Sequence, residues 1–110
     1  PQVWDYEGMA RAVPGHVEFW LGYYVEVLGV DEVYLYDMDG TFGSVPYVQE
    51  LHSLGRLVYE NAMARIPPLE ELYTTRGFTT VSAYFAQALV QHHCWQQARH
   101  NADWVISLNH

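Results

Sequence analysis

The sequence contains no lysine, so all five of its positive charges are arginine, and the formal net charge is −8. A nucleic-acid partner requires a basic surface that displaces counterions from its phosphates. Cys94 is the only cysteine, which excludes an intrachain disulfide and a cysteine-rich zinc motif. No apolar run approaches the ~18 residues of a membrane-spanning helix. We therefore expect neither a nucleic-acid partner nor a membrane span within this piece of chain.

The composition that is present is typical of one small globular domain. Half of the 110 residues are apolar and 16% are charged, which is the balance of a folded chain. That length supports a single hydrophobic core. The chain begins at Pro1 and ends at His110, directly after an apolar run. We therefore expect residues 1–110 to be one partial domain that continues beyond both ends.

The hydrophobic pattern alternates between helical and strand periods. Helical spacing predicts helices over residues 17–28, around residues 45–52, and from residue 81 to about residue 101. Apolar runs predict three strands, at residues 32–36, 57–60 and 104–108. The residues before 16 are expected to be irregular, and residues 61–80 to form a long connection. This order favours right-handed crossovers, and therefore an α/β fold with a parallel sheet and flanking helices.

Asp37 and Asp39 are the strongest candidates for functional residues. They directly follow an apolar run that begins at Val33, where a buried parallel strand would reach the ligand-binding edge of its sheet. A carboxylate there can accept hydrogen bonds from a ribose or uracil, ligate a cation or attack phosphorus. A solvated turn is the alternative, because Asp and Gly are common turn residues. The apolar strand before the two carboxylates favours the functional interpretation.

The same residues also resemble the start of the haloacid dehalogenase-type phosphatases. In the string from Asp37 to Thr41, Asp37 would be the nucleophile and Asp39 the general acid and base. Those enzymes further need a downstream Ser or Thr, a lysine and another acidic pair, and this chain has no lysine. The phosphatase is therefore an alternative to a second resemblance, described below.

A cluster near the end of the last predicted helix contains His92, His93, Cys94 and His100. Zinc sites on helices use ligand pairs at i and i+4, or Cys-x-x-Cys pairs, and neither spacing occurs here. We expect His92 to be a partly buried histidine with its hydrogen bonds satisfied. We expect Cys94 to be a small core residue.

From His16 to His110, the order and spacing of the motifs resemble glycosyltransferase family 92 and its relatives of the GT-A type. That family has a helix of the form Glu-Trp-x-x-Tyr-(Tyr/His)-x-x-x-Gly-Val, then a strand ending in Tyr-Asp-x-(Asp/Ser). The matching residues here run from Glu18 through Gly29 and Val30 to Asp37 and Asp39.

Later motifs of the family match in part. A glutamine seven residues before a cysteine corresponds to Gln87 and Cys94, and residues 102–108 resemble the strand that leads to the metal-binding Asp-x-Asp. Asn109 stands at the first aspartate of that motif, and His93 stands where the family has an aspartate before the cysteine. The first strand of the family and its Asn-Glu would lie before or around residues 4–7, where the sequence has no clean match.

The resemblance implies the nucleotide-binding half of a nucleotide-sugar-dependent glycosyltransferase, with a partial GT-A or Rossmann-like sheet. Its partners would be a nucleotide-sugar donor and a glycan or protein acceptor, in the lumen of the Golgi. It implies that Asp37 and Asp39 contact the nucleoside, that Gln87 faces the donor, and that Asn109 begins a site for Mn²⁺ or Mg²⁺. No catalytic base can be named.

Because the acceptor side is not among these residues, we expect residues 1–110 alone to be inactive. A degenerate glycosyltransferase-like subunit without catalytic activity is a further alternative. In either case the expected exposed core face would suit a protein partner that covers it.

Overall fold

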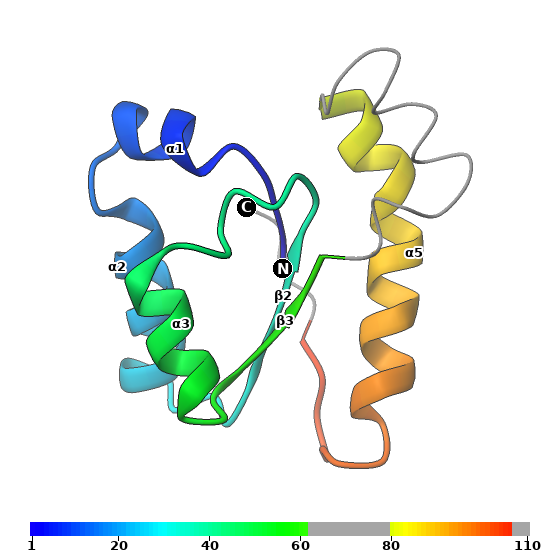
Figure 1. Ribbon diagram of the computed structural model, residues 1–110. Coiled ribbons are helices and arrows are strands. Elements are labelled where there is room, and N and C mark those ends of the chain that lie inside the picture. The colour runs from blue at the N-terminus through cyan, green and yellow to red at the C-terminus, as the bar shows by residue number, and fades with distance from the viewer. Residues whose placement is uncertain (62–79, 107–110) are drawn as a thin grey trace.

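A computed structural model describes residues 1–61 and 80–106 (Figure 1). Three parallel strands form a sheet in the order β1 (Gln2–Val3), β2 (Val33–Asp37) and β3 (Leu57–Glu60). The helices are α1 (Tyr6–Ala12), α2 (His16–Gly22), α3 (Pro46–Ser53) and α5 (Thr80–Ala98), and a π-helical turn, η1 (Tyr23–Val27), continues α2. The prediction of an α/β domain with a parallel sheet is confirmed.

Strand β2 is the centre of the sheet, and its side chains alternate between two differently covered faces. Val33 and Leu35 belong to a large cluster under α1, α2 and α3, whereas Tyr36 belongs to a smaller cluster under α5. Figure 1 shows the same separation, with α5 alone on one side of the strands. The domain therefore has three layers among its described residues.

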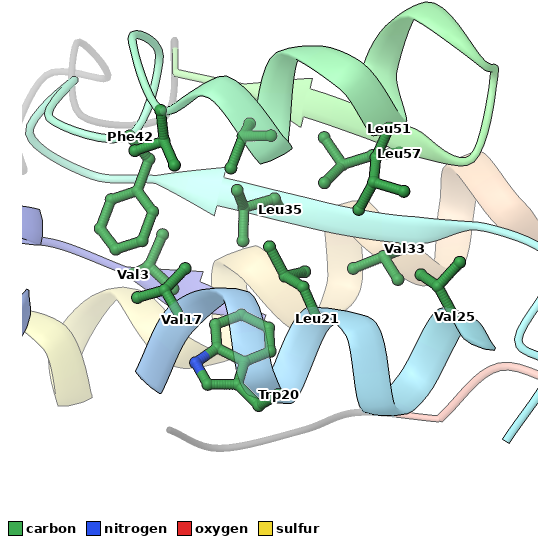
Figure 2. Packing of buried hydrophobic residues seen from close by; sticks show 12 residues of the cluster. Val3, Val17, Trp20, Leu21, Val25, Val33, Leu35, Phe42, Leu51 and Leu57 are labelled. Carbon is green, nitrogen blue, oxygen red and sulfur yellow. The ribbon is translucent and has the colours of Figure 1, made fainter. Parts of the chain in front are cut away.

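The larger cluster is the main hydrophobic core. Leu35 is fully buried and lies against Leu21 of α2, with Phe42 of the loop after β2 closing one end (Figure 2). Burying side chains of this size contributes roughly 1.5–3 kcal/mol each. The apolar periodicity that predicted the helix over residues 17–28 is therefore the pattern of residues that α2 and η1 direct into this core.

The smaller cluster joins α5 to β2 through a polar contact. The Tyr36 hydroxyl and Nδ1 of His93 are 2.6 Å apart, and the two rings meet edge to face. Burial raises the pKa of Tyr36, so its hydroxyl stays protonated and can donate this hydrogen bond. The expectation for His92 was wrong: His92 is exposed, and the partly buried histidine is His93. Cys94 is half-buried against this cluster, close to its expected role.

One predicted strand differs from the structure. Residues 104–106 have no strand, and Trp104 and Ile106 are 89% and 74% exposed. Residues 107 and 108 lie outside the described part of the chain, as do residues 62–79 of the predicted connection. An apolar, aromatic run favours a strand in composition, but pairing with a neighbour is what makes one, and residues 104–106 have no such pairing.

The third strand comes instead from the segment expected to be irregular. Strand β1 has two residues, Gln2 and Val3, paired with Tyr36 and Asp37, and is followed directly by α1. Two residues are too few to show a period of two in a sequence. The structure therefore adds a strand and a helix before residue 16.

Arg56 fixes the turn that leads from η1 into β2. Its guanidinium donates to the carbonyl oxygens of Asp31 at 3.0 Å, Val30 at 2.9 Å and Val25 at 3.3 Å. Gly29, which directly follows the predicted helix over residues 17–28, has φ 71°, a conformation that favours glycine. The chain leaves the helix through Gly29, and Arg56 satisfies the carbonyl groups that this exit leaves unpaired.

We expect Arg56→Ala to lower the free energy of unfolding by about 1–3 kcal/mol, because three carbonyl groups lose a charged donor. Urea denaturation measures the loss. Arg99→Ala is the matched control, since Arg99 lies exposed over the ring of Trp95 and should change the value by less than ~1 kcal/mol. Equal losses in the two variants would contradict this role for Arg56.

Candidate functional site

Two loops meet at the carboxyl edge of the sheet because β1 and β2 are parallel and end together. Val3 pairs with Asp37, so the segment that follows β1 and the loop that follows β2 start side by side. Figure 1 shows these segments at the same end of the strands. This edge is where open α/β sheets bind ligands. The structure therefore confirms that Asp37 ends a strand at such an edge.

Asp37 uses its carboxylate inside the protein. Its Oδ1 accepts from the backbone N–H of Gly40 at 3.1 Å. Its Oδ2 accepts from the backbone N–H of Phe42 at 2.8 Å and from the Tyr59 hydroxyl at 2.5 Å. The side chain is 1% exposed. Asp37 thus joins the end of β2, the following loop and β3.

Burial dominates the electrostatics of Asp37. It raises the pKa of the Asp37 carboxyl, the bonds from Tyr59 and Phe42 oppose that rise, and the nearby charge of Asp39 adds to it. The pKa of Tyr59 is also raised, first by burial and then by its bond to Asp37. The Tyr59 hydroxyl therefore stays protonated and donates a hydrogen bond to the carboxylate.

Asp39 ties the two loops together. Its Oδ2 accepts from the backbone N–H of Asp5 at 2.8 Å, and its Oδ1 accepts from the hydroxyl and the N–H of Thr41 at 2.7 and 3.2 Å. The Thr41 hydroxyl in turn accepts from the N–H of Tyr6 at 3.0 Å. Asp39 is nonetheless exposed. It is both a bridge and an accessible carboxylate of this edge.

The start of α1 is shaped to meet that bridge. Asp5 has φ 52°, an uncommon conformation that Asp tolerates better than most residues. Its side chain accepts from the N–H of Gly8 at 3.1 Å and so caps α1. A Cβ at Gly8 would lie 2.1 Å from an Asp5 carboxylate oxygen, so a larger residue there would displace the side chain that caps α1.

The two carboxylates differ in exposure rather than in the number of hydrogen bonds that they accept. Each accepts three hydrogen bonds from backbone N–H groups and hydroxyls of the protein. Asp37 is buried, whereas Asp39 is exposed. A hydrogen-bond donor of a ligand can therefore reach the carboxylate of Asp39 but not that of Asp37.

Two further residues, Gln87 and Asn109, were expected at the site. Gln87 is half-buried on α5, whose N-terminal half lies toward the carboxyl edge of the sheet (Figure 1). Asn109 lies outside the described residues. Within residues 1–61 and 80–106, no three His, Cys, Asp or Glu side chains gather as metal ligands would. In the same ranges, no helix is long and apolar enough to cross a membrane.

Tyr59, Thr41 and Asp5 are the residues of this edge that the sequence did not indicate. Tyr59 lies within an apolar strand pattern, where nothing separates it from a core residue. Asp5 had a usable signal, since an Asp three residues before a glycine, with Glu7 in the first turn, fits a helix N-terminus.

Comparison of the chain with protein-family models, with curated proteins and with solved structures found no match. The resemblance to glycosyltransferases therefore stays a prediction from the sequence motifs.

The raised pKa of Asp37 predicts a pH dependence of stability. The folded protein holds the proton of the Asp37 carboxyl more tightly than the unfolded chain does. The contribution of Asp37 to the free energy of unfolding therefore falls as the pH rises from the usual pKa of 3.8 through the raised pKa of the folded protein. Urea denaturation at several pH values should show this decline in the free energy of unfolding for the unaltered chain but not for Asp37→Asn. Asp31→Asn removes an exposed carboxylate before β2 and controls for net charge. A decline that survives in Asp37→Asn would assign the effect to another group.

Proposed function

We propose that this chain is the nucleotide-binding part of a nucleotide-sugar-dependent glycosyltransferase of the GT-A type. The observation that carries the proposal is the accessible carboxylate of Asp39, on a hydrogen-bonded loop at the carboxyl edge of a parallel sheet. An accessible carboxylate suits a ribose hydroxyl or a uracil N–H, both of which donate hydrogen bonds.

Strand β1 adds support from the fold. The resemblance requires a strand before or around residues 4–7, and the sequence alone offered no clean match there. Gln2 and Val3 form a strand immediately before Trp4, parallel to β2. The described residues thus have a first strand, then a helical segment, and then the strand that ends in Tyr36-Asp37. The resemblance implies the same order of elements.

The charge of this edge indicates which part of a nucleotide-sugar donor would bind there. Asp5, Glu7 and Asp39 are exposed acidic residues at this edge, Asp5 and Asp39 on the two loops and Glu7 in the first turn of α1. Such a surface repels a diphosphate and attracts neutral hydrogen-bond donors. The diphosphate would therefore need a divalent cation, Mn²⁺ or Mg²⁺, and the proposal keeps Asn109 for that cation and Gln87 for a donor contact.

Asp37 makes the phosphatase alternative less suitable. A nucleophilic carboxylate must reach a phosphorus atom with a free oxygen. Asp37 is 1% exposed, and its two oxygens accept from Gly40, Phe42 and Tyr59. Its place in the proposal is changed accordingly: Asp37 holds the loop, and Asp39 is the residue that meets the nucleoside. The acceptor, a partner over an exposed apolar face and a Golgi location stay parts of the proposal.

Isothermal titration with UDP, with and without Mn²⁺, tests the proposal on the unaltered chain. We expect binding that Asp39→Asn weakens by about 1–3 kcal/mol, because a charged acceptor is replaced by a neutral amide. Two variants separate contact from scaffold. Asp31→Asn removes a similar charge away from this edge. Thr41→Val removes the hydroxyl between Tyr6 and Asp39 but leaves the carboxylate.

Both controls should bind UDP more tightly than Asp39→Asn. If Thr41→Val costs as much as Asp39→Asn, the shape of the loop rather than its carboxylate determines affinity. Absence of UDP binding, together with tight Mg²⁺-dependent binding of beryllium fluoride, would reverse the ranking in favour of the phosphatase.

A further inference from the structure

We infer that Tyr59 is a positioning residue for nucleotide binding: from β3 it holds, through Asp37, the loop of residues 37–43 that presents Asp39. The inference rests on the proposed function and adds to it a residue that lies outside the loops of the edge. Tyr59 would act without touching the donor, because its hydroxyl is already directed at Asp37.

The register of the sheet brings Tyr59 to that position. Its Cα pairs with that of Leu35 in the parallel ladder, two residues before Asp37 on the same face of β2. A tyrosine side chain is long enough to extend along the strand to the next residue of that face. The hydroxyl therefore arrives at Oδ2 of Asp37, where the Phe42 N–H also donates.

Gly43 shows how closely the loop follows the ring. A Cβ at Gly43 would lie 3.0 Å from the Tyr59 hydroxyl and 3.5 Å from its Cζ. The loop thus passes directly over the end of the tyrosine side chain. One carboxylate and one hydroxyl together determine the path of the backbone from Asp37 to Gly43.

The orientation of Asp39 depends on that path. Asp39 lies between Asp37 and Gly40, whose N–H is bound to Oδ1 of Asp37. It also lies before Phe42, whose N–H is bound to Oδ2 of the same carboxylate. If Asp37 loses its Tyr59 donor, these two amide bonds alone hold a buried charge, and the loop between them becomes less ordered.

Tyr59→Phe removes the hydroxyl and keeps the ring. We expect UDP affinity to fall about three- to tenfold, because the loop that presents Asp39 loses one hydrogen bond that supports it. Hydrogen exchange at the Gly40 and Phe42 amides should quicken by about the same factor, while the amides of Val33 to Tyr36 change less. Tyr47→Phe is the matched control, since Tyr47 donates only to Glu26, at 3.4 Å, and should change neither measurement.

A second variant changes the same contact from the other side. Gly43→Ala keeps the Tyr59 hydroxyl but crowds it, so its UDP affinity and loop exchange should fall between those of the unaltered chain and Tyr59→Phe. Unchanged UDP affinity in Tyr59→Phe, beside binding by the unaltered chain, would overturn the inference and leave the proposed function standing. Exchange that quickens equally along all of β2 would also overturn it, because Tyr59 would then stabilise the whole domain. No UDP binding by the unaltered chain would overturn both.

Discussion

The structure of the carboxyl edge of this domain depends on one buried carboxylate, that of Asp37. An ionised group taken out of water is costly unless hydrogen bonds replace its hydration, and Asp37 obtains three such bonds from Gly40, Phe42 and Tyr59. Meeting that requirement determines the path of the loop after β2. It also joins β3 to that loop, and through Asp39 the loop reaches the N–H of Asp5 at the start of α1. The edge is therefore a connected set of hydrogen bonds around one charge.

This arrangement changes how an acidic pair at a strand end should be interpreted. Two carboxylates beside an open edge suggest two ligand contacts, but here most of their acceptor positions serve the protein itself. The inner residue is scaffold, and the outer one is exposed to a ligand. A ligand that meets such a group does not have to order the loop as it binds, so less of its interaction energy is lost to conformational entropy. Specificity in the proposed function would then come from geometry rather than from the amount of negative charge.

Sequence reasoning succeeded where a pattern is repeated and failed where a contact depends on register. α2 with η1, α3, β2 and β3 each carry several apolar residues in a fixed period, and all were predicted close to their observed bounds. The bounds of α5 were predicted as well, although Leu89 and Trp95 of that helix are exposed and Val90 and Ala98 are buried. Strand β1 has too few residues for a period, and the run at 104–106 has strand composition without a pairing partner. At the site, the position of Asp37 and Asp39 at a strand end could be predicted. The bond from Tyr59 could not, because it follows from how β3 pairs with β2.

On the opposite face of the sheet, the position of α5 determines where Gln87 would lie in the proposed donor site. Residues 80–98 of α5 contain no Asp, Glu, Lys or Arg, so no such ion pair can fix the rotation of this helix. A directional contact from α5 to the sheet is the bond between His93 and Tyr36, beside the small cluster of Tyr36, Met38 and Val90. Gln87 lies six residues earlier, about 9 Å along the axis toward the carboxyl edge. Tyr36 and Asp37 are neighbours on β2 with side chains on opposite faces. One strand end therefore positions both the acidic loop, through Asp37, and the helix that carries Gln87, through Tyr36.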